Sequence, residues 1–233
     1  MKIQYTLSFI FLSHFPLAFG QTTDKIPAEM GKNSFGLYGG VNFQNINGSD
    51  AGGNKLSNKL VTRFNVGINE EIAVAPEFYL QLGLQYTGKG TKGPVVYTDG
   101  SGAHNITREI KLNYAELPIN LLFKPLLGAG HLIIGFGPYF SYCFGGKALF
   151  SGNDAPADAN IQFVKTAPSS DANNLVYFKR MDVGANAFFG YQFHSGFNVV
   201  FNSQLGLVNI NSTTASKLAN KNTGFGLAVG YRF

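Results

Sequence analysis

Residues 224–233 read Gly-Phe-Gly-Leu-Ala-Val-Gly-Tyr-Arg-Phe, so that large apolar side chains alternate with small or polar ones. Successive side chains of a strand point to opposite faces. One face carries Phe225, Leu227, Val229, Tyr231 and Phe233. The other carries Gly224, Gly226, Ala228, Gly230 and Arg232. An apolar face beside a small, polar face is typical of a transmembrane barrel strand, with lipid on one side and a lumen on the other.

Seven earlier segments repeat this alternation. The eight predicted strands are residues 34–46, 61–74, 76–89, 107–124, 131–148, 176–194, 196–209 and 222–233. Short connections near 75–76, 126–130 and 194–196 alternate with long ones at 47–60, 90–106, 149–175 and 210–221, which are rich in turn-forming residues. The sequence therefore predicts an all-β protein, an eight-stranded antiparallel up-and-down transmembrane β-barrel with short periplasmic turns and four longer extracellular loops.

Aromatic residues on the apolar parity gather at the two ends of these strands. Phe35, Phe78, Phe193 and Phe233 fall at the predicted periplasmic ends, and Phe43, Tyr86, Tyr142, Phe144 and Tyr177 at the opposite ends. Amphipathic rings at both membrane interfaces form such girdles.

The N-terminus has the features of an export signal. Lys2 precedes an apolar run, and small residues end at Gly20 before Gln21. Pro16 breaks the run, which is shorter than the roughly 20 residues of a membrane-spanning helix, so a retained anchor is the weaker alternative. We predict a cleaved signal peptide at 1–20, a short periplasmic segment at 21–33, a barrel domain at 34–233, and an outer-membrane location.

The composition is 45% hydrophobic and only 13% charged, which is low in charge for a soluble domain. Cys143 is the only cysteine, so an intramolecular disulfide and a cysteine-based metal cluster are excluded. No metal-ligand spacing or phosphate-binding loop is present, and no cofactor is expected. The pI of 9.2 does not indicate nucleic-acid binding, because an exported chain rarely meets that partner.

The second parity predicts a polar lumen. Its charged residues are Arg63, Glu77, Glu116, Arg180, Asp182 and Arg232, set among many Asn and Gln. Unpaired buried charges are very costly, so ion pairs and amide hydrogen bonds are expected to plug the barrel as a structural network. Pro118 and Pro138 fall inside predicted strands and predict local bulges. The alternative is a soluble periplasmic ligand-binding barrel of the lipocalin type, with the apolar parity inside.

Tyr114-Ala115-Glu116-Leu117-Pro118-Ile119 with Lys124 resembles the Tyr-x-Glu-x-Pro strand of the Bacteroidetes outer-membrane β-barrel proteins, the PorT-like family. Four further matches follow in the family's order. They are Gly137-Pro138-Tyr139, Asp182-Val183-Gly184 leading to Gly190-Tyr191, Leu205-Gly206-Leu207 with Asn209-Ile210, and Gly230-Tyr231-Arg232-Phe233. The resemblance implies an eight-stranded barrel in a Gram-negative outer membrane. It supplies no catalytic residues, although the family's name-giving group is implicated in protein secretion.

The expected function is that of a noncatalytic outer-membrane barrel, structural or acting through its loops, because eight strands leave an interior just wide enough for side chains. Expected partners are outer-membrane lipid and lipopolysaccharide, a protein or small ligand at the loops, and the barrel assembly machinery, which would read Tyr231 and Phe233. Lysines on or near the loops could meet lipid phosphates: Lys55, Lys59, Lys89, Lys92, Lys147, Lys165, Lys217 and Lys221. A lipid-modifying enzyme is the second alternative, for which Asp99, Ser101 and His104 are the only candidates, on a flexible loop.

Overall fold

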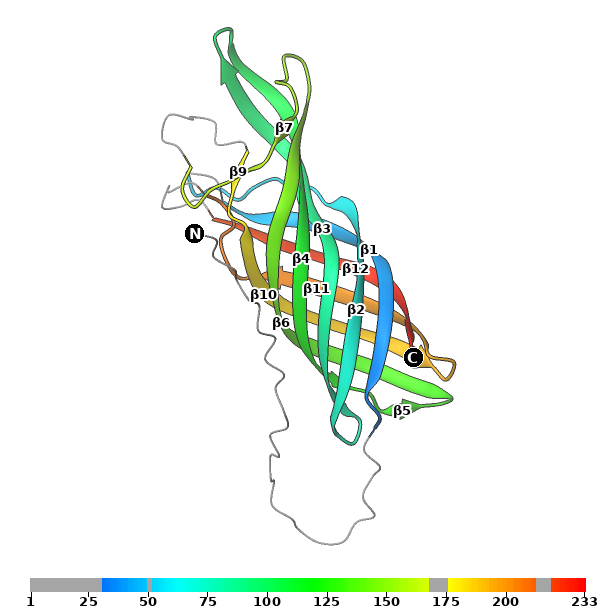
Figure 1. Cartoon of the computed structure of the whole chain (residues 1–233). Coiled ribbons are helices and arrows are strands. Elements are labelled where there is room, and N and C mark those ends of the chain that lie inside the picture. Colours follow the sequence, from blue (N-terminus) through cyan, green and yellow to red (C-terminus); the bar gives the residue numbers. More distant parts are fainter. Residues whose placement is uncertain (1–30, 50–51, 168–175, 213–218) are drawn as a thin grey trace, which may run out of the picture.

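The computed structural model describes residues 31–49, 52–167, 176–212 and 219–233. Eight long strands form a closed antiparallel ring (Figure 1). They are β1 (Ser34–Ser49), β2 (Val61–Ala75), β3 (Phe78–Asp99), β4 (Gly102–Phe123), β6 (Gly130–Ser151), β10 (Met181–Phe193), β11 (Phe197–Gly206) and β12 (Ala219–Arg232). Each pairs with the next long strand along the chain, including β10 with β6, and β12 pairs with β1 to close the ring. The predicted eight-stranded antiparallel barrel is confirmed.

The two ends of the barrel differ in their connections, which give them their names. The turn end holds the short connections at 76–77, 128–129 and 194–196, the two-residue strand β5 (Leu126–Leu127) that pairs with the start of β6, and the C-terminus. The hairpin end holds the long connections and the β3–β4 hairpin, which rises above the ring at the top of Figure 1. No helix in the described ranges is long and apolar enough to cross a membrane.

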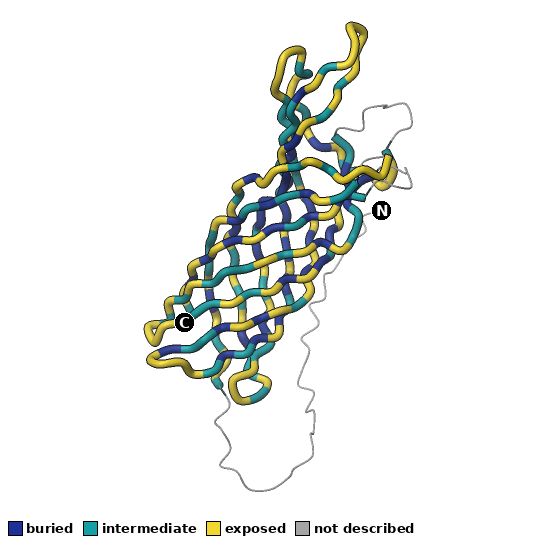
Figure 2. Tube along the Cα trace, turned by 180° about the vertical axis from the view of Figure 1, so that it is seen from behind, coloured by how far each residue is buried: buried dark blue, intermediate teal, exposed yellow. Residues whose placement is uncertain are grey.

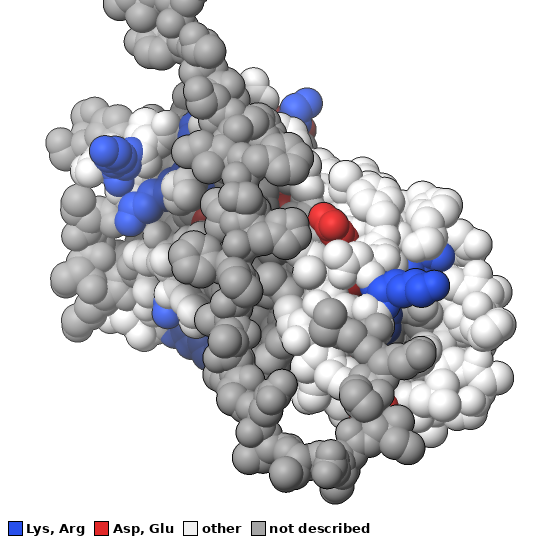
Figure 3. All heavy atoms as spheres, turned by 60° about the horizontal axis from the view of Figure 1, so that its bottom comes forward, with Lys and Arg blue, Asp and Glu red and all other residues white. Residues whose placement is uncertain are grey.

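Side chains alternate between the inside and the outside of the ring, which Figure 2 shows as alternating burial along each strand. Leu227 of β12 is 56% exposed, whereas its neighbour Ala228 is 7% exposed. Phe136, Phe189 and Leu84 are likewise more than half exposed on the outer wall. Charged side chains are few on the stretch of wall seen in Figure 3. The outside of the barrel is therefore its apolar face.

The prediction of a long loop at 90–106 is wrong, because β3 and β4 continue through it as a hairpin. Their pairing runs without interruption to Asp99 and Gly102, leaving only Gly100 and Ser101 at the tip. Pro94 is tolerated because β3 has no partner on its other side at this height, and a proline at a sheet edge removes no ladder hydrogen bond. The hairpin, together with the end of β6, extends the barrel wall into a narrow sheet.

The inside of the hairpin end is apolar rather than polar. The short strands β7 (Ala159–Asn160), β8 (Gln162–Phe163) and β9 (Tyr177–Phe178) fold over this end. Tyr177 therefore lies in the cap and not in the predicted aromatic girdle. The cap closes an apolar cluster in which every member is at most 5% exposed: Ile46, Ile110, Leu112, Tyr114, Cys143, Ala148, Ile161, Phe178 and Ile210.

The bulges predicted at Pro118 and Pro138 are absent. Pro138 pairs in register with Ala185, and the register around Pro118 is the same on both sides of it. A Cβ on Gly83, which faces Pro118 from β3, would lie 2.8 Å from the Pro118 ring. The missing side chain at Gly83 thus makes room for the proline ring without a change of register. The register shifts lie instead at 73–75 and 113–114.

Candidate functional site

Glu116 of β4 lies at the centre of the lumen and is fully buried. Its Oε2 lies 2.8 Å from Lys89 Nζ and accepts a hydrogen bond of 2.7 Å from Ser141 Oγ. Its Oε1 accepts hydrogen bonds of 2.6 Å from both Gln85 Nε2 and Gln204 Nε2. One carboxylate thus ties together β3, β4, β6 and β11, and every contact is assisted by charge.

Asp182 of β10 completes this cluster from the opposite wall. Its Oδ2 lies 3.2 Å from Lys89 Nζ and accepts hydrogen bonds from Tyr139 Oη at 3.2 Å and Asn222 Nδ2 at 2.9 Å. Lys89 Nζ also lies 4.0 Å from the centre of the Tyr139 ring, which is within the range of a cation–π interaction. The cluster seals the lumen beneath the apolar cap.

A second ionic cluster closes the lumen toward the turn end. Lys124 Nζ lies 2.7 Å from Glu71 Oε2, and Arg232 Nη2 lies 2.8 Å from Glu71 Oε1. Arg232 Nη2 also donates to Asn69 Oδ1 at 2.6 Å, and Lys124 Nζ to Gln192 Oε1 at 2.7 Å. Because Arg232 is the penultimate residue, this cluster fastens the last strand to β2 and to the end of β4.

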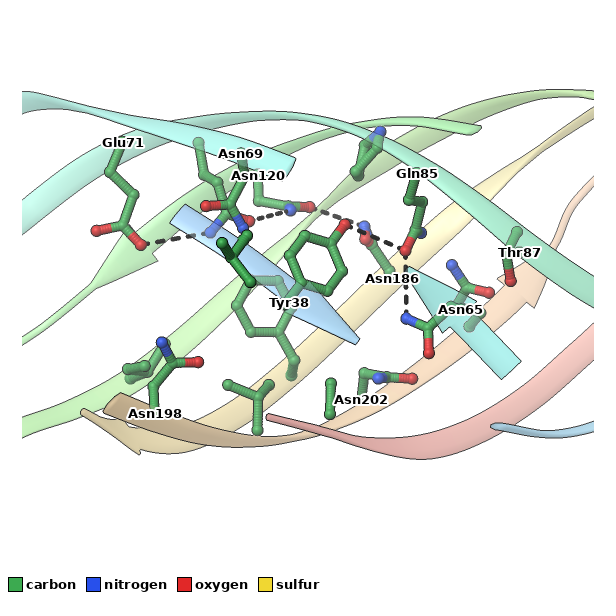
Figure 4. A pocket seen from close by; sticks show the side chains of 18 of the residues that line it. Tyr38, Asn65, Asn69, Glu71, Gln85, Thr87, Asn120, Asn186, Asn198 and Asn202 are labelled. Carbon is green, nitrogen blue, oxygen red and sulfur yellow. Dashed lines mark hydrogen bonds between the residues drawn. The ribbon is translucent and has the colours of Figure 1, made fainter. Parts of the chain in front are cut away.

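A chain of amide side chains runs from the second cluster into the middle of the lumen (Figure 4). Asn186 Nδ2 donates to Asn120 Oδ1 at 2.7 Å, Asn120 Nδ2 to Gln81 Oε1 at 2.9 Å, and Gln81 Nε2 to Glu71 Oε1 at 3.4 Å. The remaining space is a cavity of about 100 Å³, which suits a few water molecules rather than a file of solute. Side chains therefore occupy the lumen at both ionic clusters, with a small cavity between them.

The structure places three of the six predicted lumen charges in these clusters, namely Glu116, Asp182 and Arg232. The other three lie elsewhere. Glu77 is exposed in the turn between β2 and β3, at a φ of 64°. Arg63 donates to Asn113 Oδ1 at 2.9 Å, and Arg180 is exposed at the hairpin end.

Three lumen charges were missed by the sequence reasoning: Lys89, Glu71 and Lys124. The lumen position of Glu71 could have been predicted, because Glu71 follows Asn65 and Asn69 at even spacing on the lumen parity. Lys124 was noted only within the family motif. Lys89 was placed at the end of the predicted strand 76–89, beside a loop, and it is buried because β3 runs ten residues further, to Asp99.

The hairpin tip brings together the residues considered for hydrolysis. Ser101 Oγ lies 3.0 Å from His104 Nε2, and His104 Nδ1 lies 3.4 Å from Asp154 Oδ2. Ser101 Oγ and N also donate to Asp99 Oδ1 at 2.7 and 2.8 Å, and these bonds hold the pKa of Asp99 down at about 2. The hydroxyl proton is therefore directed to a permanent anion rather than to the imidazole.

The same tip lacks walls that would hold a substrate. A Cβ added to Gly100 or Gly102, on either side of Ser101, would meet no atom within 4 Å. An oxyanion site needs donors fixed around the reacting carbonyl, which an open turn does not supply. Within the part of the chain that is described, no group of three or more His, Cys, Asp or Glu is arranged to hold a metal ion.

No protein-family model matches the sequence, and no curated protein matches it. Among solved structures the chain is similar to Ail, the attachment invasion locus protein of Yersinia pestis, in complex with sucrose octasulfate. The identity is 17%, the TM-score 0.42, and 87% of this chain and 100% of that chain are covered. OprG of Pseudomonas aeruginosa gives 12% identity and a TM-score of 0.43, with coverage of 90% and 99%. A major outer-membrane protein of Thermus thermophilus gives 11% identity and a TM-score of 0.45, with coverage of 87% and 100%. At these scores the fold assignment rests on the strand pairing of the chain itself.

Proposed function

We propose that this chain is a noncatalytic integral outer-membrane protein whose closed barrel presents its hairpin end outside the cell. The observation that carries the proposal is the distribution of polarity, which is the reverse of that in a soluble protein. Ion pairs lie inside the barrel, and large apolar side chains lie outside around the ring. Soluble proteins rarely expose continuous apolar surface of this extent. A bilayer satisfies such a wall, and a closed barrel leaves no unpaired strand edge in lipid.

Two layers of ion pairs, the amide chain and the apolar cap argue against solute conduction, so the role we propose is structural or binding. The parts available to a ligand or partner protein are those beyond the membrane at the hairpin end, where function commonly lies on loops. The proposal includes membership of the PorT-like Bacteroidetes family. A secretion-associated role of the kind implicated for that family's name-giving group is the alternative function. The family membership is supported by the motif residues Tyr114, Glu116 and Pro118, whose side chains all point into the barrel.

The C-terminal residues carry a proposal about assembly. Tyr231 and Phe233 are 43% and 69% exposed on the outer wall, with their rings 5.0 Å apart. We expect the barrel assembly machinery to recognise them in the last strand. Since Phe233 N donates to Phe35 O at 2.8 Å, Phe233→Ala is a cleaner test than deletion because it keeps the backbone bond. Membrane insertion at the normal rate in this variant would contradict the role in recognition.

Fractionation of cells that express the full chain tests the proposal. We expect the protein in the outer membrane, with electrophoretic migration that changes on boiling, because folded barrels resist detergent. The predicted signal at 1–20 and segment at 21–33 lie mostly outside the described residues, and the mass of the mature protein would test the cleavage. Conductance in planar bilayers should stay at the background of protein-free membranes. Recovery as a soluble periplasmic protein would contradict the location, and stable channels would contradict the closed lumen.

A further inference from the structure

Four cationic side chains line one groove on the outer face of the barrel at the hairpin end. Arg63 comes from β2, Lys111 from β4, Lys147 from β6, and Arg180 immediately precedes β10. No acidic residue in the described part of the chain lines this groove. Glu109 lies beside it and bonds Lys111 at 3.2 Å, so one carboxylate stands against four cations. The excess of positive charge is therefore confined to this groove, and the rest of the outer wall carries few charges.

Lys111 and Lys147 are direct cross-strand partners in the β4–β6 register. Like charges directly opposite each other in an antiparallel sheet destabilise it. Both lysine side chains point away from the apolar cluster that holds Ile110 and Ala148. The two ammonium groups therefore share the outer side of the sheet, where they repel each other. An anion between the two ammonium groups would convert the repulsion into two attractive contacts.

The groove is fixed in position by an aromatic group on the lipid-facing wall. The Tyr86 ring lies between those of Phe64 and Phe144, with ring centres 5.0 and 6.1 Å away and tilted planes. Its hydroxyl donates at 2.8 Å to Asn113 Oδ1, which also accepts from Arg63 Nη2 at 2.9 Å. Tyrosine at this position marks the level where the hydrocarbon ends and the polar head groups begin. In the outer membrane proposed above, the cations would therefore lie at the depth of lipid phosphates.

Arg180 is oriented toward the groove by its neighbours. Its guanidinium lies 4.5 Å from the Phe163 ring centre and 5.6 Å from that of Tyr142, and Nη1 donates to Cys143 O at 3.0 Å. Stacking fixes the plane of the guanidinium while leaving further N–H donors for an anion. Arg63 Nε is buried without a partner among the described residues.

We propose that this groove binds the phosphate of an acylated, phosphorylated glycolipid of the lipid A type in the outer leaflet. The apolar wall below the groove, with Phe140 at 47% and Phe144 at 54% exposure, would receive the acyl chains. Inorganic phosphate has no acyl chains to pack against that wall, so a lipid is the favoured source of the phosphate group. The inference rests on the outer-membrane location proposed above and names the lipid that the protein would hold there.

Binding of lipid A to the purified full-length barrel in detergent micelles tests the inference. The probes are bisphosphorylated lipid A, the same lipid after enzymatic dephosphorylation, and inorganic phosphate. The groove variant is Lys111→Gln with Lys147→Gln, and the matched control is Lys55→Gln with Lys221→Gln, which removes the same charge at the same end outside the groove. Heat-dependent migration is recorded for each variant to show that the barrel has folded.

We expect the groove variant to bind lipid A at least about tenfold more weakly than the unchanged protein, and the control within about twofold. Dephosphorylation should weaken binding to a similar degree. Equal binding by the groove variant, or by dephosphorylated lipid, would overturn the inference. So would displacement of lipid A by inorganic phosphate at comparable concentrations. If any of these results is obtained with a protein that is folded and located in the outer membrane, only the lipid site is refuted. If the protein is instead recovered as a soluble periplasmic chain, the proposed function itself is refuted.

Discussion

Glu116 Oε2 and Lys89 Nζ lie 2.8 Å apart in the middle of the barrel, and neither side chain is more than 1% exposed. Lys89 also faces Asp182, so two carboxylates depend on one ammonium group. Replacing Lys89 with Met keeps most of the length of the side chain and leaves both carboxylates without their cationic partner. We expect a loss of about 3 to 5 kcal/mol in the free energy of unfolding, the usual effect of breaking a buried ion pair.

Denaturant titration of the protein in lipid vesicles would measure that loss. Lys92→Met, at an exposed position on the same strand, serves as the control and should change stability by at most about 1 kcal/mol. A loss of similar size in both variants would mean that the Lys89 pair does not stabilise the barrel.

Arginine on the outer wall should destabilise the barrel. Leu82→Arg, Phe136→Arg and Phe201→Arg place a charge on the lipid-facing parity, and each should cost about 2 to 4 kcal/mol near the bilayer midplane. The measurement is folding from denaturant into vesicles. Gly152 is a poor control, because its φ of 137° strains any side chain. Val96→Arg on the hairpin, at a side chain 58% exposed, is a better one and should be neutral. Equal tolerance of all four would contradict the assignment of the outer face.

Gly83→Ala should destabilise the barrel, whereas Gly145→Ala should not. The added Cβ would lie 2.8 Å from Pro118 Cγ, and the proline ring cannot rotate away. Overpacking of this kind costs about 1 to 3 kcal/mol. At Gly145 an added Cβ meets no atom within 4 Å, so Gly145→Ala should leave the midpoint of unfolding unchanged. Matching midpoints for the two variants would show that the close approach to Pro118 does not exist in solution.

The hairpin tip should show a carboxyl group of unusual acidity. Hydrogen bonds from the Ser101 hydroxyl and backbone lower the pKa of Asp99 from 3.8 to about 2. Because the folded-state pKa is lowered, the bonds stabilise the tip at pH above about 4, and that stabilisation is lost as pH falls toward 2. Titration of the Asp99 carboxyl by NMR in micelles would measure the pKa. Ser101→Ala should bring the pKa back toward 3.8, and an unchanged value would contradict this account.

The fold was predictable because the outer and lumen-facing sides of a barrel wall impose a period of two on every strand. Leu227 and Ala228 show the contrast, and the lumen amides, including Asn120, Asn186 and Asn202, line the central cavity as their parity requires. The ends of strands were less predictable. Gly90, Gly93 and Pro94 interrupt the alternation of β3 although pairing with β4 continues past them. Because of this interruption the predicted strand ends at Lys89, beside a predicted loop.

The apolar cap and the cationic groove lay beyond the reach of strand periodicity. The cap joins Ile46, Ile110, Ile161 and Ile210, which come from segments far apart in the chain. The groove likewise depends on the β4–β6 register, which sets Lys111 opposite Lys147. A single sequence gives the parity of each strand but not which residue of the next strand lies opposite.

Phe188 and Phe189 provide the most direct test of which face meets lipid. They are neighbours on β10, but Phe188 lines the lumen cavity and Phe189 is 59% exposed on the outer wall. The chain contains no tryptophan, so Phe188→Trp and Phe189→Trp each create a single fluorescent reporter. In vesicles that contain brominated lipid, we predict strong quenching of the tryptophan at 189 and little at 188. Stronger quenching at 188, or none at either position, would contradict a barrel with its apolar face in the membrane.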